Sequence, residues 1–519
     1  MKKILLTCLM IIFSMNVTFA AKKIIYIPID NPPCNLKQVV EVGEKLDYEI
    51  VTPPEELLGR DSERLGEPDK LWRWLDENSF GATAAVISTD AMFYGSLVGS
   101  RMHDLSAREI MDRAENFEDY HKNFPYLPIY IFGTIMRTPT VAGSSAEPDY
   151  YKTYGDKIYN YTRLKDKFEM EKLSRSEMKN LSQLKNDIPE EFLNDWLSRR
   201  AKNYNANEYL IDLTRKGYFQ YFLIGCDDNA PYSQTHLESR HLSEYGQDLG
   251  KTIFQVMSGA DELGMLMISR AINTDLDEIP FVAVGYNEGV GKNTIPSYCN
   301  EKIGTDISKA IVAARCLEIP APERADLVLA VNTNHNGKTF AASSPKNKIK
   351  PRSDTRTFMK ILNGYLEKDY PVGVVDISTA NGSDNALMNQ LQKNNLQFKL
   401  RAYGGWNTAT NASGFLIGAG VLTKYMNQHD KNKLLLTRYF DDWLYQANIR
   451  TQLANGLIWT VPGEGNYSKL GTRRAGLEKL TAELAKNFAI ENINADVRNI
   501  TAEFTWNRCF ECDFSFDYL

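Results

Sequence analysis

The sequence has 519 residues, of which 43% are hydrophobic and 11% aromatic, enough to build a large buried core. Its formal net charge is −6, with 60 Lys and Arg against 66 Asp and Glu. No basic stripe stands out, so nothing in the composition indicates nucleic acid as a partner.

The first twenty residues predict a secretory signal peptide. Lys2 and Lys3 precede the apolar run ILLTCLMIIF, and Thr18 to Ala20 offers small residues for cleavage. The apolar run is too short to span a bilayer, and no later run is long and apolar enough. We therefore expect a bacterial periplasmic or secreted protein with no stable membrane insertion after cleavage.

Nine apolar runs rich in β-branched and aromatic residues predict strands. Helical patterns separate most of these runs, and strict alternation requires parallel strands with right-handed crossovers. We predict an α/β fold built as a (β/α)8-like barrel, with a doubly wound open parallel sheet as the alternative because nine runs exceed eight. The runs lie at about 24–29, 83–89, 127–133, 219–226, 253–258, 280–286, 326–332, 371–376 and 397–403.

After a signal peptide at 1–20, we expect one barrel-like domain over 21–430. A charged stretch at about 146–216 has helical spacing and predicts an insertion after the third strand. It could form a wall or lid over a site, or simply present a solvated helix face. Residues 431–519 predict a C-terminal helical extension, which ends in the strand-like alternation AEFTWNRCFECDFSF.

Several of the apolar runs stop abruptly at acidic residues, and two acidic pairs are the strongest catalytic candidates. Asp227-Asp228 and Asp261-Glu262 each follow a predicted strand, where α/β proteins build their sites. Paired carboxylates can divide acid and base or nucleophile roles, as glycoside hydrolysis requires. The segment SGADE resembles the Asp-Glu pair that ends a barrel strand in some β-hexosaminidases. Helix capping is the alternative for Asp261 and Glu262, which precede a strong helical pattern.

A second set of residues predicts sugar binding. In the segment YGGWNTATN the Trp offers a flat face, and the Asn side chains both donate and accept hydrogen bonds. A buried Trp in a Gly-rich turn is the alternative, and Asp90 fits a helix cap at least as well as a site. The predicted substrate-binding residues are Asp30, Asp90, Arg101, Asn334, His335, Asp376, Asn381, Trp406, Asn407 and Asn411.

Metal and cysteine chemistry have weaker support. Only six His are present and no HxH or HExxH spacing occurs, which argues against a catalytic transition metal. We expect no cofactor and leave a structural Ca²⁺ open, because the acidic strand ends offer oxygen ligands. Cys509 and Cys512 form a CxxC pair, for which a local disulfide or two free thiols fits better than zinc or redox chemistry.

Six segments together resemble a bacterial family known as domain of unknown function 4127. They are IYIPIDNPPCNL, VTPPEELLGR, STDAMFYGSLVGSR, GADELGMLMISR, DISTANGSDNAL and YGGWNTATNASG, and they span nearly the whole mature chain. The family lacks an established activity, so the resemblance implies only that these acidic and amide motifs belong together. The chain departs from the family pattern at Asn31 to Cys34, where an acidic or basic residue and an Arg before Pro are expected. If that Arg contacts substrate in relatives, specificity differs here.

From these residues we expect an exported glycoside hydrolase that acts on an amino sugar or a short oligosaccharide. The alternative is a non-catalytic or metal-dependent envelope protein that binds a sugar or polyol. Clustering of the carboxylates in space discriminates between the two, because acids that each cap their own helix would not form a catalytic site.

Overall fold

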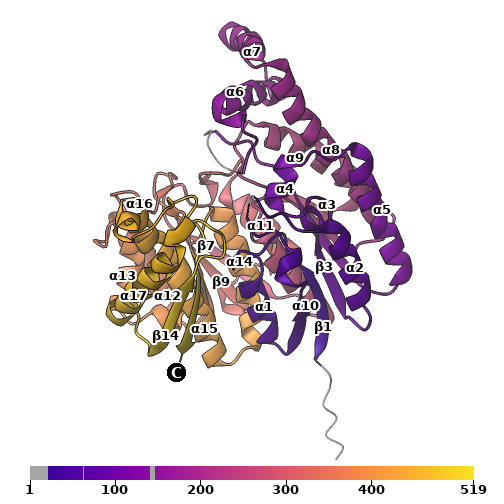
Figure 1. Ribbon diagram of the computed structural model, residues 1–519. Helices are drawn as coiled ribbons and strands as arrows, with labels where there is room; N and C mark the ends of the chain where they lie inside the picture. The colour runs from indigo at the N-terminus through magenta and orange to yellow at the C-terminus, as the bar shows by residue number, and fades with distance from the viewer. Residues whose placement is uncertain (1–20, 62, 141–145, 519) are drawn as a thin grey trace, which may run out of the picture.

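The computed structural model describes residues 21–61, 63–140 and 146–518. The predicted signal peptide, residues 1–20, lies outside these ranges. Two parallel sheets form the body of the protein (Figure 1). The first sheet has the order β2-β1-β3-β4-β5-β6 and the second the order β13-β11-β9-β7-β8. The predicted α/β class is therefore confirmed.

A strand overlaps each of the nine predicted runs, although the last run, 397–403, begins as a 3-10 helix at Gln397–Lys399 and only its end is a strand. Each is a continuous apolar run because a strand of a covered parallel sheet is buried on both faces. The edge strands β2 (Tyr48–Val51) and β8 (Leu317–Glu318) are short and were not predicted. The predicted strands are β1 (Lys22–Ile27), β3 (Ala84–Ser88), β4 (Ile129–Ile135), β5 (Tyr221–Cys226), β6 (Phe254–Ser258), β7 (Phe281–Tyr286), β9 (Leu327–Asn332), β11 (Val372–Asp376) and β13 (Ala402–Gly404).

The two sheets share one topology. Numbered by chain order within each sheet, the first five strands follow the order 2-1-3-4-5 in both, and β6 extends the first sheet. This is the doubly wound open arrangement, given above as the alternative to a barrel. In each sheet the first strand pairs with the second strand on one side and with the third strand on the other. Their edge strands do not pair with each other in the part of the chain described here.

Helices cover both sheets. Those of the first half are α1 (Lys37–Glu44), α2 (Pro68–Asn78), α3 (Thr89–Tyr94), α4 (Leu97–Met102), α5 (Ala107–Asn123), α6 (Tyr151–Met170), α7 (Arg175–Asp187), α8 (Glu190–Arg215), α9 (Gln234–Tyr245) and α10 (Leu263–Asp275). Those of the second half are α11 (Ile303–Ala313), α12 (Ser353–Leu366), α13 (Asn385–Lys393), α14 (Ala409–Leu422), α15 (Gln428–Arg438), α16 (Arg450–Ala454) and α17 (Arg474–Asn492), with a π-helix at Tyr439–Ile449.

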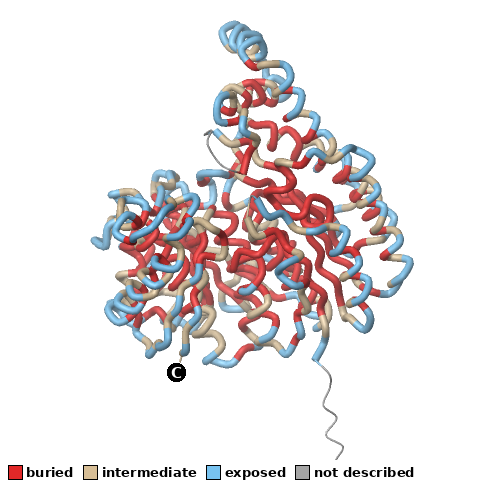
Figure 2. The backbone as a smooth tube through the Cα atoms, viewed as in Figure 1, coloured by how far each residue is buried: buried red, intermediate tan, exposed pale blue. Residues whose placement is uncertain are grey.

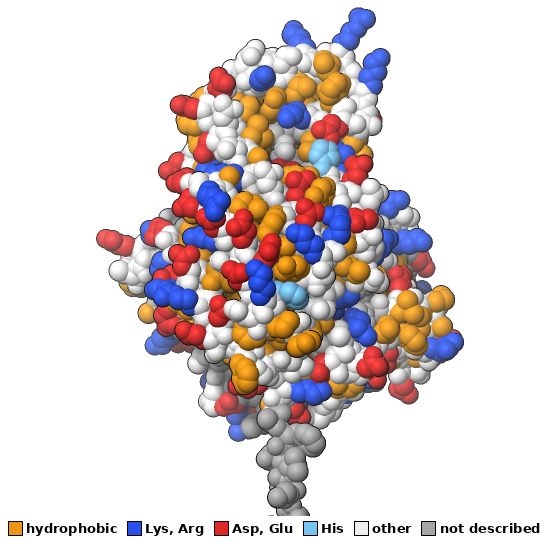
Figure 3. Space-filling model, turned by 90° about the vertical axis from the view of Figure 1, so that its right-hand side faces the viewer, with side chains coloured by type: hydrophobic (Ala, Val, Ile, Leu, Met, Phe, Trp, Pro, Cys, Tyr) orange, Lys and Arg blue, Asp and Glu red, His pale blue; other side chains and the backbone are white. Residues whose placement is uncertain are grey.

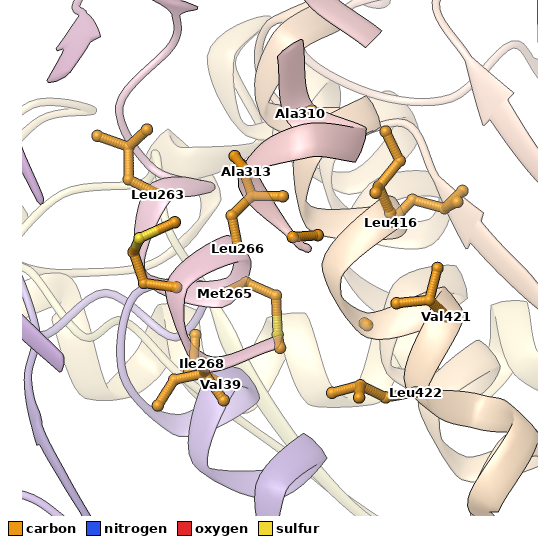
Figure 4. Packing of buried hydrophobic residues seen from close by; sticks show 14 of the residues in the cluster. Val39, Leu263, Met265, Leu266, Ile268, Ala310, Ala313, Leu416, Val421 and Leu422 are labelled. Carbon is orange, nitrogen blue, oxygen red and sulfur yellow. The ribbon is translucent and has the colours of Figure 1, made fainter. Parts of the chain in front are cut away.

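One helix, α10, joins the two sheets. Every residue of α10 from Leu263 to Asn273 is buried, and its apolar side chains pack against α11 and α14 (Figure 4). Gly418 allows the close approach of α14, because an added Cβ there would lie 3.0 Å from Cγ of Met265. Burial of a side chain such as Leu266 contributes about 1.5–3 kcal/mol. The sheets therefore share one continuous core, visible as the buried interior in Figure 2.

Two further segments pack onto this body. Helices α6, α7 and α8 lie between β4 and β5, over the range where the sequence predicts a helical insertion, and they rise at the top of Figure 1. The C-terminal segment packs on the second sheet and ends in an antiparallel hairpin, β14 (Val497–Glu503) and β15 (Asp513–Tyr518). A single strand was predicted there. A short parallel pair, β10 (Phe340–Ala341) and β12 (Thr379–Ala380), completes the strands.

Charge is not strongly segregated on the face of the molecule drawn in Figure 3. Acidic and basic side chains are intermixed over the face drawn in Figure 3, in agreement with the balanced composition. Within the described ranges, no helix is long and apolar enough to cross a membrane.

Candidate functional site

A cavity of about 490 Å³ lies at the carboxyl ends of the first sheet. The loops after β1, β5 and β6 contribute Asp30, Asp227, Asp228 and Asp261. The loop after β13 in the second sheet contributes Trp406 and Asn407, and the first turn of α14 contributes Asn411. The cavity therefore lies between the two sheets, next to the point where the first sheet reverses its strand order, as expected for an open α/β protein.

Eight of the fourteen predicted site residues line this cavity. They come from both acidic and amide motifs, although these motifs are up to about four hundred residues apart in the chain. The eight are Asp30, Arg101, Asp227, Asp228, Asp261, Trp406, Asn407 and Asn411.

Three asparagine side chains hold the carboxylate of Asp261. The amide nitrogens of Asn407 and Asn411 each donate to Oδ2 at 2.9 Å, and that of Asn35 donates to Oδ1 at 3.2 Å. Burial raises the pKa of Asp261 to about 6, although the amide hydrogen bonds counteract part of this effect. Asp261 is therefore mostly ionised at neutral pH and fixed in one orientation.

Asp30 is the partner of Asp261 in the cavity. The Asn35 amide nitrogen that donates to Asp261 also donates to Oδ1 of Asp30 at 2.7 Å. Two oxygens that share one donor at these distances are at most about 6 Å apart, so the two carboxyl groups are neighbours in the cavity. Burial, followed by the negative charge of Asp261, raises the pKa of Asp30 to about 8. One member of the pair is thus mostly protonated at neutral pH and the other mostly ionised.

Arginines pair with the remaining acids of the cavity. Arg101 from α4 donates through Nη2 to Oδ2 of Asp227. Arg137, which follows β4, donates to Oε1 of Glu147 at 2.7 Å and to Oδ2 of Asp228 at 3.1 Å. Burial and the adjacent Asp227 raise the pKa of Asp228. These alternating charges form a network in which each acid faces an arginine.

The C-terminal segment closes the cavity with residues that the sequence analysis missed. Trp506 donates through Nε1 to Oδ1 of Asn31 at 3.0 Å, which ties the end of the chain to the loop after β1. The Arg508 guanidinium lies 4.3 Å from the centroid of the Trp506 ring and donates to Glu511 at 2.8 Å. The segment WNRCFEC combines Trp, Arg and Glu, which could have indicated a site. Its alternating pattern led instead to the prediction of a strand.

Glu262 does not line the cavity. It is fully buried, and an added Cβ on Gly259 would lie 1.8 Å from its Oε1, so the glycine makes room for the carboxyl group. Burial raises the pKa of Glu262 well above its usual value. Glu262 stands at the N-cap of α10 but makes no side-chain capping hydrogen bond.

Asp90 is likewise absent from the cavity lining. Its two carboxylate oxygens accept hydrogen bonds from the backbone and hydroxyl groups of Thr134, at 2.7 and 2.9 Å. Asp90 thereby fixes α3 against β4. The capping role belongs to Ser88, whose hydroxyl accepts from the backbone of Ala91.

Four other predicted site residues belong to the second sheet and organise its own loops. Asp376 accepts hydrogen bonds from Asn332, Tyr403 and the backbone of Asp384 at 2.7–2.9 Å. Asn334 donates to the backbone oxygens of Lys338 and Ser378, at 2.7 and 2.8 Å, and His335 lies half-exposed beside Asp354. The backbone N–H of Asn381 donates to Asn407 at 2.7 Å. Asn381 therefore supports the loop that carries Trp406 and Asn407.

The described part of the chain has no metal-ligand cluster, and its cysteines are free. There, no group of three or more His, Cys, Asp or Glu side chains is placed to hold a metal ion. The six cysteines beyond the predicted signal are free and buried, and these include Cys509 and Cys512. The CxxC pair thus takes the form of two free thiols.

These observations define a two-sheet α/β protein with a carboxylate- and arginine-lined cavity between the sheets. Residues 24–515 match the family described as "Protein of unknown function (DUF4127)", and the chain belongs to this family. The resemblance drawn from the sequence motifs is therefore confirmed. No curated protein matches the sequence.

Proposed function

We propose that the protein is an exported glycoside hydrolase that acts on an amino sugar or a short oligosaccharide. The observation that carries this proposal is the pair of buried carboxyl groups, Asp30 and Asp261, which share the Asn35 amide. Their pKa values of about 8 and about 6 place one proton on the pair near neutral pH. Two carboxyl groups whose surroundings separate their pKa values are suited to acid and base or nucleophile roles.

In this proposal Asp30 is the general acid and Asp261 the nucleophile. Asp30 protonates the leaving glycosidic oxygen, and ionised Asp261 attacks or stabilises the anomeric carbon. The separation of less than about 6 Å between their oxygens favours retention of configuration, because inverting enzymes leave roughly 6.5–9.5 Å for a water molecule. After glycosyl transfer, Asp30 acts as the base that activates water.

The rest of the cavity suits recognition of a polar, ring-shaped substrate. Trp406 and Tyr298 provide aromatic surface, on which the apolar face of a sugar ring can pack. The Arg101–Asp227 and Arg137–Asp228 pairs present both donors and acceptors to hydroxyl or acetamido groups. The signal-like residues 1–20 support export.

A panel of chromogenic glycosides that includes N-acetylhexosaminides tests this proposal. Purified mature protein is assayed with and without EDTA, beside the Asp30→Asn and Asp261→Asn variants. Each substitution should lower the hydrolysis rate by about 10²–10⁴-fold, as expected for loss of a positioned acid or nucleophile. Glu262→Gln is the matched control, because Glu262 is adjacent in sequence but lies outside the cavity. Full activity in both Asn variants would contradict the assignment.

A non-catalytic sugar- or polyol-binding protein is the second candidate. The observation that favours it is the pairing of Arg101 with Asp227 and of Arg137 with Asp228, which forms a preorganised polar surface. Saturable binding of a sugar without turnover across the panel would support this candidate. Activity abolished by EDTA would instead indicate a metal-dependent protein.

A further inference from the structure

A second, smaller pocket adjoins the main cavity. Its volume is about 190 Å³, and it lies between the turn at 466–469, the segment 506–508 and the residues Asp61 and Glu63. We call it the outer pocket and the 490 Å³ cavity the inner cavity. Ser468, Trp506 and Arg508 line both. The two spaces are therefore neighbours that share these three residues as a common wall.

The walls of the outer pocket are held in place by local contacts. The side-chain oxygen of Asn466 accepts from the backbone N–H groups of Ser468 and Lys469, at 2.9 and 3.0 Å, which fixes the turn. The backbone oxygen of Asn507 accepts from Leu470 at 3.0 Å and joins this turn to the second segment. Arg508 is held over Trp506 by stacking. The pocket is thus built from ordered groups.

The polar groups of the outer pocket suit hydroxyl groups. Glu63 and Lys469 form an ion pair at 2.7 Å, with side chains 71% and 64% exposed. An exposed pair of this kind contributes at most about 1 kcal/mol, so a ligand can replace it with little loss. The carboxylate can then accept from a hydroxyl group and the ammonium can donate to one.

We propose that the outer pocket is a subsite for the second sugar unit of an oligosaccharide whose first unit occupies the inner cavity. This inference rests on the proposed function and specifies its substrate class as a chain of at least two units. Ser468, Trp506 and Arg508 lie where the two units join. Glu63, Lys469 and Asn507 contact the second unit.

Calorimetric titration with N-acetylglucosamine and its linear oligomers of two to four units tests the subsite. In the unaltered protein, the dissociation constant should fall by roughly tenfold or more from one unit to two, as expected for added hydrogen bonds to charged groups. The Glu63→Ala/Lys469→Ala double variant should lose most of this gain. Asp119→Ala/Lys122→Ala, which removes an exposed ion pair on α5, is the matched control and should retain it.

The outcomes separate this inference from the proposed function. Length-dependent binding that depends on Glu63 and Lys469, without hydrolysis, would support the subsite and contradict the enzyme assignment. Equal affinity for all lengths, a gain that persists in the double variant, or no binding of any of these sugars would overturn the subsite.

Discussion

The two sheets share one topology but use their strand-end acids differently. In the first sheet Asp30 and Asp261 face a cavity, and most of their hydrogen bonds come from amide side chains. In the second sheet Asp376 is fully buried and accepts from Asn332, Tyr403 and the backbone of Asp384, and no cavity lies beside it among those described above. An acid at the end of a parallel strand therefore marks a site only where the surrounding loops leave space beside it.

The largest expected difference between the sheets concerns catalysis. Asp261→Asn should lower glycoside hydrolysis by about 10²–10⁴-fold, because the amide cannot act as nucleophile. The same substitution should lower the free energy of unfolding by about 1–3 kcal/mol, because an amide nitrogen replaces one of the oxygens that accept from the three asparagines. Rate measurements and urea unfolding on the same preparation check both. A comparable rate loss in Asp376→Asn would remove the distinction between the two sheets.

Substitution of a strand-end acid in the second sheet should instead reduce stability. Asp376→Ala leaves the buried donors of Asn332, Tyr403 and Asp384 without their acceptor, so we expect a loss of about 2–5 kcal/mol in unfolding free energy. Urea unfolding measures this loss. His335→Ala at the half-exposed neighbouring position should change stability by less than about 0.5 kcal/mol and serves as the control. Equal effects would contradict the structural role of Asp376.

The pH dependence of activity tests the proposed roles of Asp30 and Asp261 in the first sheet. Activity should rise with pH as Asp261 ionises near 6 and fall as Asp30 loses its proton near 8. The raised pKa of Asp30 also means that its contribution to stability is complete below its unfolded pKa and is lost as pH rises through about 8. Profiles of kcat/KM against pH test the first effect. A profile without the alkaline limb would assign the acid role elsewhere.

The smallest expected effect concerns Glu262. Burial raises the pKa of Glu262 in the folded protein. As pH rises, the unfolded chain releases this proton first, so the free energy of unfolding decreases. Glu262→Gln should change stability by less than about 1 kcal/mol at pH 4, and it should weaken the decline in stability toward alkaline pH. Thermal unfolding from pH 4 to 9 tests this. An unchanged pH profile would mean that Glu262 is ionised in the folded protein.

Much of the strand layout was predictable because each covered strand is a continuous apolar run. The division into two sheets was not predicted, although ELGMLMISRAI in α10 is apolar all around. A helix that is apolar on all faces is typically enclosed by the protein on all sides, as α10 is, whereas a surface helix is amphipathic. Edge strands such as β2 carry too few residues for a pattern.

The candidate site was predictable where its residues follow strands directly. Asp30, Asp228 and Asp261 meet at one edge because parallel strands end there together. Trp506 and Arg508 could not be placed, because their position depends on contacts with residues more than four hundred positions earlier, such as Asn31. Local spacing carries no information about such contacts.

The Trp506–Asn31 contact also sets the order in which the site can be assembled. Synthesis produces Asn31 and the first sheet early, yet the inner cavity lacks a wall until Trp506 to Glu511 have emerged and docked. In a chain that lacks this wall we expect a more open cavity, in which the pKa of Asp30 would move back toward its usual value. The environment of the inner cavity therefore depends on the docking of residues 506–511 against the loop after β1.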